Sequence, residues 1–176
     1  MKKLKVGIIF GGMSSEHDVS ITSALNIIEN MDNSKYEKHC IYISTEGTWY
    51  NYDYTINTHK FGEKLNNITE IKDYIKYLQN LDIIFPVLHG KYGEDGSIQG
   101  LCEFIKKPYV GCGILASSLG MDKVYTKMIF EKAGIAQAKS IYIKVFNTQY
   151  TLFDNNLNEE NLNLESLCTE IEKQIK

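Results

Sequence analysis

The sequence of 176 residues contains no arginine, and all nineteen of its basic residues are lysine. A guanidinium group holds a carboxylate or phosphate through two parallel hydrogen bonds, whereas lysine acts as a point charge. The 19 basic and 22 acidic residues give a net charge of −3. The lysines form no basic cluster of the kind that binds the phosphates of a nucleic acid. We therefore expect no nucleic-acid partner.

Long apolar runs are also absent. The longest, at residues 6–10 and 83–88, are far shorter than the roughly 20 residues of a membrane helix. The N-terminus shows no apolar segment followed by a small-residue cleavage site. The composition, 43% hydrophobic and 23% charged, is that of a globular protein with room for one domain and a part of a second. We expect a cytoplasmic protein that does not bind membranes.

Cysteine and histidine are few and scattered. The four cysteines form no C-x-x-C pair, and the four histidines do not stand at the spacing of a metal site. We therefore expect buried free thiols and no metal site made by this chain alone. The cysteines are Cys40, Cys102, Cys112 and Cys168.

Strand-like and helix-like segments alternate along most of the chain. Nearly continuous apolar runs predict strands that are buried on both faces of a parallel sheet. Apolar residues at helical spacing lie between these runs. The predicted strands are residues 5–10, 38–44, 81–88, 109–110 and 139–145, with a hairpin near 46–54, and the predicted helices are 16–28, 68–78, 97–107 and 116–134 with a break near Gly120. The pattern predicts an α/β fold, a three-layer Rossmann-like domain with a parallel sheet.

The C-terminal part has a different composition. Residues 146–163 are rich in asparagine and acidic residues, which is typical of a linker, whereas apolar residues recur at helical spacing over 164–176. An isolated helix of this length is marginal in water, so it either packs on the preceding domain or belongs to another. We predict a domain at 1–145, a linker at 146–163 and the beginning of a second domain at 164–176.

The segment GGMSSEHDVS, residues 11–20, follows the first predicted strand. In open α/β sheets ligands bind at the carboxyl ends of strands, where glycines allow close approach and a helix N-terminus is positive. Ser14 and Ser15 are candidate N-caps. The carboxylates of Glu16 and Asp18 either only complement the helix dipole or, in the case of Glu16, bind a cation such as an ammonium group.

Two further segments carry candidate chemistry. LHGKYGEDG, residues 88–96, places three glycines and four charged or titratable side chains after a buried strand, which is typical of a site loop. Its His89 could donate to a developing oxyanion or accept a proton. In the third segment, SSLGMDK, Asp122 is a candidate helix cap and Lys123 lies in the first turn, where the dipole disfavours a cation. Lys123 is therefore either solvated or shares an anion with the free N–H groups.

Four segments in this order, GGMSSEHDVS, PVLHGKYGEDGSIQG, PYVGCG and SSLGMDKVYTK, resemble the amino-terminal half of the D-alanine:D-alanine ligases of the ATP-grasp superfamily. D-alanine:D-serine ligases are close relatives of these enzymes. The resemblance covers roughly residues 4–145. It implies an amino-terminal (pre-ATP-grasp) domain that contributes to a homodimer, in a cytoplasmic enzyme that joins two D-amino acids for peptidoglycan precursors with ATP and Mg²⁺.

The resemblance also implies roles for individual residues. Glu16 would bind the ammonium group of the first D-alanine, and His89 would lie beside the carboxyl chemistry. Val19 and Glu94 would line the same substrate site, with the role of Glu94 only loosely assigned. Lys123 would reach towards the phosphates of ATP.

The sequence departs from the family pattern beyond residue 145. The glycine- and serine-rich flap after a V-K-P strand, the arginine that stabilises the tetrahedral intermediate and the magnesium ligands do not occur in it. We therefore expect a folded fragment of a ligase that contains only the beginning of the ATP-grasp domain. Such a fragment should be inactive alone and should bind neither ATP nor Mg²⁺ tightly. The alternatives are a D-alanine:D-serine ligase fragment, a standalone small-molecule-binding module and a dimerisation domain.

Overall fold

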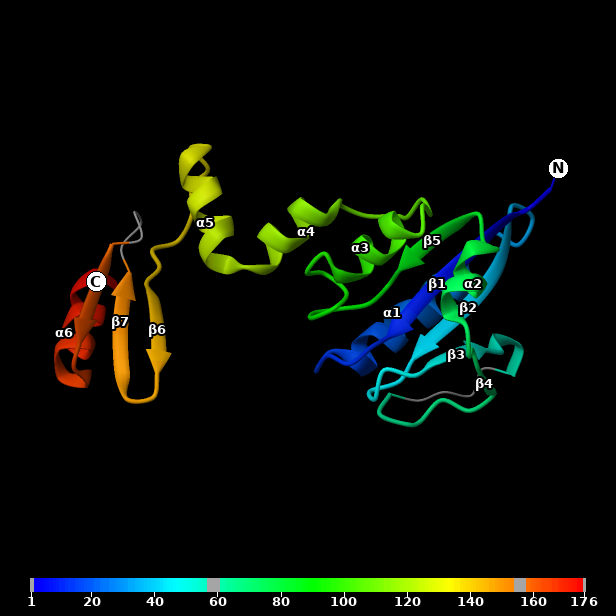
Figure 1. The fold of residues 1–176 in the computed structure, drawn as a ribbon, viewed down its shortest axis with the longest axis horizontal. Coiled ribbons are helices and arrows are strands. Elements are labelled where there is room, and N and C mark those ends of the chain that lie inside the picture. The colour runs from blue at the N-terminus through cyan, green and yellow to red at the C-terminus, as the bar shows by residue number, and fades with distance from the viewer. Residues whose placement is uncertain (1, 57–60, 154–157, 176) are drawn as a thin grey trace. The chain divides into compact units, whose positions relative to one another are not determined.

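The computed structural model describes residues 2–56, 61–153 and 158–175, and the chain forms two compact units. The first unit is Met1–Met121 and the second is Asp122–Lys176. Each unit has its own sheet, as Figure 1 shows. Among the described residues, no helix is long and apolar enough to span a membrane.

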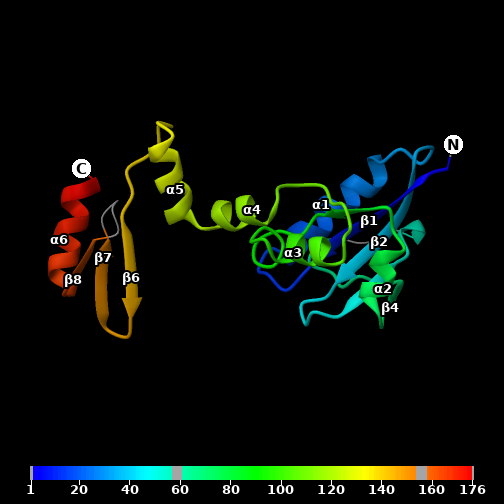
Figure 2. The same cartoon turned by 45° about the horizontal axis from the view of Figure 1, so that its top comes forward.

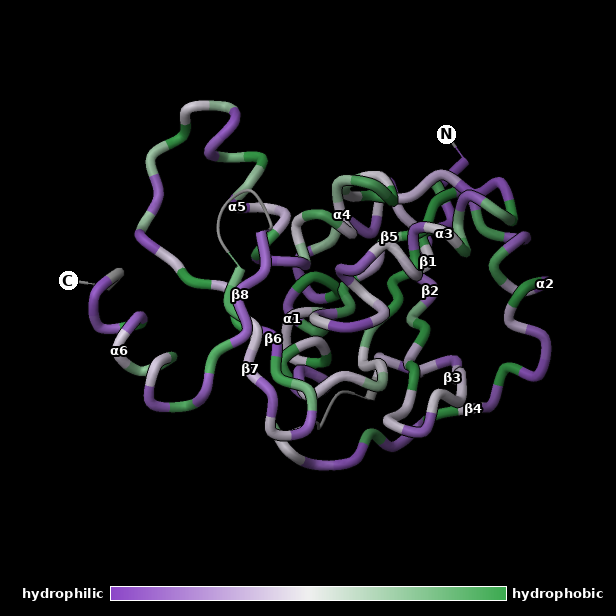
Figure 3. The backbone as a smooth tube through the Cα atoms, turned by 60° about the vertical axis from the view of Figure 1, so that its left-hand side comes forward, coloured by the Kyte–Doolittle hydropathy of each residue, from purple (hydrophilic) through white to green (hydrophobic). Residues whose placement is uncertain are grey.

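The first unit is built on a five-stranded sheet with the order β4-β3-β2-β1-β5. The three strands β2, β1 and β5 run parallel to one another, whereas β3 and β4 are antiparallel to their neighbours. The central β1 carries a nearly continuous apolar run, and β3 mixes aromatic with polar residues (Figure 3). The strands are β1 (Leu4–Gly11), β2 (Tyr36–Ile43), β3 (Trp49–Tyr52), β4 (Ile68–Glu70) and β5 (Ile83–Pro86).

Helices cover both faces of this sheet (Figures 1 and 2). Alternate residues of β1 point to opposite faces, so Ile8 packs with α1 whereas Ile9 packs with α2 and α3. Burial of these apolar side chains on both faces is the main source of stability. The helices of the unit are α1 (His17–Asn30), α2 (Tyr74–Gln79), α3 (Ser97–Phe104) and α4 (Ile114–Met121), with a 3₁₀ turn at Tyr54–Ile56.

The predicted three-layer α/β fold is confirmed, with two local corrections. The sheet is mixed, because β3 and β4 return as antiparallel strands at its edge. Residues 68–78, predicted to be one helix, begin as β4, whose β-branched Ile68 and Thr69 pair with β3. The helix α2 starts only after Asp73, whose side chain accepts a hydrogen bond from the Lys76 N–H.

The second unit contains α5 (Lys123–Lys132) and a three-stranded antiparallel sheet followed by α6 (Leu164–Ile175). The strands are β6 (Tyr142–Phe146), β7 (Gln149–Phe153) and β8 (Glu159–Leu162). Leu152 of β7 and Leu167 of α6 are both buried, so the predicted C-terminal helix packs on this sheet. The break between α4 and α5 falls at Asp122, close to the predicted position.

Residues 146–163, predicted to be a linker, contain two strands. A two-residue turn joins β6 to β7, and its Asn147 adopts a positive φ of 54°. Asparagine tolerates this left-handed conformation, which makes it a hairpin-turn residue as well as a linker residue. The composition therefore did not separate a hairpin from a linker, and the domain division at 145 and 163 stays a prediction.

The four cysteines divide into two buried and two exposed thiols. Burial raises the pKa of Cys40 to about 12 and that of Cys102 to about 11. Cys112 and Cys168 are exposed, so the expectation that all four are buried is wrong for these two. In α6, Leu167 is buried whereas the adjacent Cys168 is exposed.

We expect an exposure-dependent pattern of thiol labelling. The reactive species is the thiolate, and a folded-state pKa near 11 or 12 leaves almost none of it at pH 8. In the native protein at pH 8, a disulfide reagent should modify Cys112 and Cys168 rapidly. Cys40 and Cys102 should react only after denaturant is added, and rapid modification of all four thiols would contradict the packing around β2 and α3.

Candidate functional site

The glycine-rich segments 11–16 and 87–96 lie side by side at one edge of the first sheet. They follow β1 and β5, which are parallel neighbours, and the Val87 N–H donates to the Ile9 carbonyl at 2.7 Å. Ser20 of α1 is fully buried behind them. Its hydroxyl donates to the Val87 carbonyl at 2.7 Å and accepts from the Gly11 N–H at 2.9 Å. One side chain thus joins the ends of both strands to α1.

Ser14 links the two segments directly. Its hydroxyl donates to the His89 carbonyl at 2.7 Å and accepts from the Glu16 N–H at 3.1 Å. A Cβ placed on Gly90 would lie 3.4 Å from Glu16 Oε1, so the carboxylate of Glu16 lies against this glycine. The structure therefore brings Glu16 next to the backbone that carries His89.

Glu16 occupies the N-cap position of α1, and its side chain makes no capping hydrogen bond. The predicted caps, Ser14 and Ser15, lie before the helix, although the Ser14 hydroxyl does bind the Glu16 N–H. The carboxylate is exposed and lies at the positive end of the helix dipole. An exposed carboxylate in this position is suited to binding an ammonium group.

The imidazole of His89 lies between a hydroxyl and a carboxylate. Nε2 is 3.1 Å from Ser23 Oγ, and Nδ1 is 3.9 Å from Glu94 Oε1. The His89 side chain is 30% exposed and that of Glu94 is 52% exposed. Glu94 also binds the loop itself, because its Oε2 accepts from the Gly90 N–H at 2.9 Å.

One face of α1 contributes three residues to this region. Glu16, Val19 and Ser23 are three and four residues apart, which places them on the same side of a helix. Val19 is 48% exposed although it is apolar. Ser23 was not among the site residues predicted from the sequence, although its helical spacing from Glu16 and Val19 is a signal that could have found it.

The loop after His89 is held in an uncommon backbone conformation. Tyr92 has a φ of 70°, which is rare for a bulky residue. Asp95 holds the loop by accepting from the N–H groups of Tyr92 at 2.9 Å and Ser97 at 3.0 Å. Partial burial acts to raise the pKa of Asp95, but these hydrogen bonds outweigh it and hold that pKa below its ordinary value.

An apolar pocket of about 170 Å³ adjoins the two glycine-rich segments. Met13, Trp49 and Leu88 line it together with the backbone of Gly12, and His89 and Lys91 also reach it. Neither Glu16 nor Glu94 lines it. His89 is therefore the candidate site residue that this pocket shares with the region of Glu16 and Glu94.

Lys123 lies in the second unit, at the first position of α5. Asp122 caps this helix as predicted, and its side chain accepts from the N–H groups of Val124 and Tyr125. Those two N–H groups are therefore already bonded to a side chain, and the role of Lys123 stays a prediction. The Lys123 side chain alone remains a candidate for binding phosphate.

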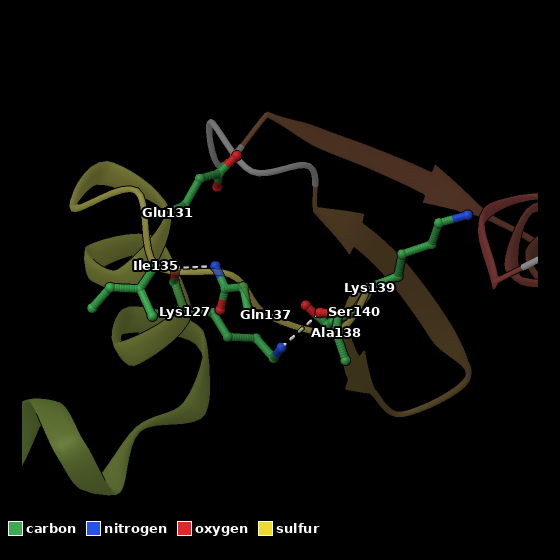
Figure 4. A pocket seen from close by; sticks show the side chains of 7 residues that line it. All are labelled: Lys127, Glu131, Ile135, Gln137, Ala138, Lys139 and Ser140. Atoms are coloured by element: carbon green, nitrogen blue, oxygen red, sulfur yellow. Dashed lines mark hydrogen bonds between the residues drawn. The ribbon is translucent and has the colours of Figure 1, made fainter.

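The second unit also has a polar pocket of about 390 Å³, beside α5 and residues 135–140 (Figure 4). Two hydrogen bonds join Lys127 of α5 to the lining residues Gln137 and Ala138. Lys127 Nζ donates to the Ala138 carbonyl at 3.0 Å, and Gln137 Nε2 donates to the Lys127 carbonyl at 2.8 Å. Because the Lys127 ammonium group already binds a carbonyl, the pocket does not present it as an unpartnered cation.

The described parts of the chain do not fit a magnesium site. Within residues 2–56, 61–153 and 158–175, no three His, Cys, Asp or Glu side chains form a group that could hold a metal ion. Magnesium is bound by several oxygen ligands, mainly carboxylates and waters. We therefore assign no chemical step to a metal held by these residues.

Known protein families include one that matches the part of the chain with the two glycine-rich segments. A family model described as the D-Ala-D-Ala ligase N-terminus matches residues 5–112, which include both glycine-rich segments. The chain belongs to the D-alanine–D-alanine ligase amino-terminal family. D-alanine–D-alanine ligase B of Clostridium tetani is 40% identical over 98% of this chain and 46% of its own length.

Solved ligase structures share the family fold. The VanG D-Ala:D-Ser ligase from Enterococcus faecalis has a TM-score of 0.68 and 28% identity, over 99% of this chain and 50% of that chain. The D-alanine–D-alanine ligase from Bacillus anthracis complexed with ATP has a TM-score of 0.59 and 27% identity, over 98% of this chain and 55% of that chain. The chain thus spans about half the length of the relatives that it matches.

The buried Ser20 hydroxyl gives a testable contribution to stability. In Ser20→Ala, the Gly11 N–H and the Val87 carbonyl lose their partner, and each unsatisfied buried group costs about 1–3 kcal/mol. We expect the free energy of unfolding, measured with urea, to fall by about 2 kcal/mol or more. Thr22→Ala is the matched control, because the exposed Thr22 hydroxyl binds only the Asp18 carbonyl of its own helix. Equal effects of the two substitutions would contradict the bridging role of Ser20.

The loop after β5 requires a glycine at position 93. A Cβ there would lie 2.5 Å from Leu88 Cβ and 2.7 Å from the Leu88 carbonyl carbon, and backbone cannot easily move away. We expect Gly93→Ala to lower the unfolding free energy by about 1–3 kcal/mol. Gly120→Ala in α4 meets no atom within 4 Å and should instead stabilise the protein by about 0.5–1 kcal/mol. Thermal unfolding of both variants checks the pair, and a neutral Gly93→Ala would contradict the close contact.

Proposed function

We propose that this chain is the amino-terminal part of an ATP-dependent D-alanine:D-alanine ligase and supplies the site for the first D-alanine. The observation that carries the proposal is the position of the Glu16 carboxylate against Gly90, next to His89, where the ends of β1 and β5 meet. Family membership and the ligase names of the relatives support the same assignment. The product would be used for peptidoglycan precursors in the cytoplasm.

The side chains at this edge suit a small zwitterion. The ionised Glu16 carboxylate offers an acceptor and a negative charge to the ammonium group, a combination stronger than a neutral hydrogen bond. His89 offers a ring nitrogen to the carboxyl end of the same molecule. Val19 presents an exposed apolar surface one turn after Glu16, suited to the methyl group of alanine. Glu94 keeps the loop closed through the Gly90 N–H.

In the intact ligase, ATP would supply the phosphoryl group that activates the first D-alanine carboxylate, so that the amine of the second D-alanine can displace phosphate. The residues of this chain would bind and orient the first substrate, which brings the reacting groups together. Lys123, as a point charge, would attract a phosphate of the nucleotide. The ATP complex of the Bacillus anthracis ligase supports the choice of nucleotide.

Two further features belong to the same proposal. The amino-terminal domain would form a homodimer with a second copy. A D-alanine:D-serine ligase is the second candidate, favoured by the similarity to the Enterococcus faecalis enzyme. Both ligases would use the same first substrate, so the site built around Glu16 and His89 serves either reaction.

D-alanine binding tests this proposal. A ligand that binds the native state stabilises it by RT ln(1 + [L]/Kd), which is about 1.4 kcal/mol at ten times Kd. We expect D-alanine at high concentration to raise the melting temperature of the 176-residue chain and to shift amide resonances of residues 14–23 and 88–94. Glu16→Gln should weaken binding at least tenfold, because the ammonium group loses its counter-charge.

Glu29→Gln provides the matched control for that experiment. Glu29 lies in the same helix, α1, and is exposed, so it tests the loss of one charge far from the site. This variant should bind D-alanine like the unmodified chain. Equal stabilisation by D- and L-alanine in all three proteins, or none by either, would contradict the proposed subsite.

A further inference from the structure

The surroundings of His89 are asymmetric. On one side, the Ser23 hydroxyl lies within hydrogen-bond distance of Nε2, at 3.1 Å. On the other, Glu94 Oε1 lies 3.9 Å from Nδ1, which is beyond a direct hydrogen bond. Ser23 comes from α1, and Glu94 comes from the loop that follows His89, so two separate elements determine the environment of one imidazole.

We infer that Ser23 is a positioning residue that holds the His89 ring through Nε2, while the charge of Glu94 places the proton of the neutral ring on Nδ1, so that His89 serves the site as a hydrogen-bond donor. The functional meaning of this inference rests on the proposed D-alanine site. A neutral imidazole has one donor nitrogen and one acceptor nitrogen, and the partner of one nitrogen decides which of them carries the proton.

The charge of Glu94 decides between the two tautomers of His89, and the Ser23 hydroxyl can pair with Nε2 in either of them. An ionised carboxylate only accepts hydrogen bonds, so the negative charge of Glu94 favours a proton on the nearer nitrogen, Nδ1. Nε2 is then an acceptor, and the Ser23 hydroxyl can donate to it. In the opposite tautomer, Nε2–H would donate to Ser23 and the Nδ1 lone pair would face the Glu94 carboxylate, which is electrostatically unfavourable.

The distance to Glu94 leaves the donor available. Glu94 already accepts from the Gly90 N–H, and its other oxygen is too far from Nδ1 for a direct bond. An oxygen atom of a ligand can therefore take the Nδ1–H bond. Of the two roles considered for His89, donor to an oxyanion and proton acceptor, this arrangement selects the donor.

Ser23, His89 and Glu94 follow the order of a hydrolytic triad, but the location of Ser23 argues against a nucleophilic role. It lies in the middle of α1, where backbone N–H groups bond to carbonyls one turn earlier. A serine nucleophile requires N–H groups directed at the developing oxyanion, and the helix uses those nearest to Ser23. A role in orienting His89 is the one that the helix permits.

Nitrogen NMR of the 176-residue chain tests the inference without any ligand. With ¹⁵N-labelled histidine at pH 8.5, long-range ¹H–¹⁵N spectra distinguish the two tautomers, and the other three histidines are internal references. We expect the Nδ1–H form to dominate at His89. Glu94→Gln should lower the ratio of Nδ1–H to Nε2–H by about threefold, because it removes the negative charge that favours a proton on Nδ1. Ser23→Ala should shift the Nε2 resonance of His89, which loses its hydrogen bond, and Ser23→Thr should keep that resonance because it retains the hydroxyl.

Thr22→Ala is the matched control, since it removes a hydroxyl from the adjacent position of α1 that binds only within the helix. It should leave the His89 spectrum unchanged. A dominant Nε2–H form, or no change in Ser23→Ala, would overturn the inference. Covalent labelling of Ser23 by a fluorophosphonate would also overturn it in favour of a nucleophile. Because no D-alanine is present, a negative result here is distinct from a failure of the subsite itself.

Discussion

The parallel pairing of β1 with β5 is the constraint on which the candidate site depends. It places the carboxyl ends of two strands that are more than seventy residues apart in sequence at the same edge of the sheet. The buried Ser20 hydroxyl then joins both strand ends to α1 through the Gly11 N–H and the Val87 carbonyl. These backbone groups would otherwise be buried without partners, so α1 cannot shift relative to the strands without a large energetic cost.

This rigid base supports side chains of a different character. The polar groups that face the site, Glu16, His89 and Glu94, are exposed or half-buried. The Gly90 N–H holds the Glu94 carboxylate, and the Ser23 hydroxyl contacts the ring of His89. Ser14 connects the two segments by binding the His89 carbonyl and the Glu16 N–H. The result is an open surface whose side chains are suited to a small charged molecule.

The proposed orientation of His89 follows from the same arrangement. A histidine on a loop could adopt either tautomer, and its chemistry would then be undefined. Ser23 on α1 gives Nε2 a partner, and the charge of Glu94 makes Nδ1 the favoured site of the proton. The helix that carries the proposed ammonium-binding carboxylate, Glu16, would thus also orient the side chain proposed to meet the carboxyl end of the substrate.

The sequence by itself determined the alternation of strands and helices, the two glycine-rich segments and their position after buried strands, because apolar periodicity and glycine punctuation are local properties. It also predicted the cap at Asp122, which the structure shows. Local pattern was not sufficient where the same residue types are compatible with two kinds of secondary structure. Asn147 forms a hairpin turn inside the predicted linker, and β4 replaces the first turn of a predicted helix. Only the tertiary structure decided that Ser23 meets His89, because these two residues, 66 positions apart in the sequence, are brought together by sheet pairing and helix packing, and no local pattern encodes that contact.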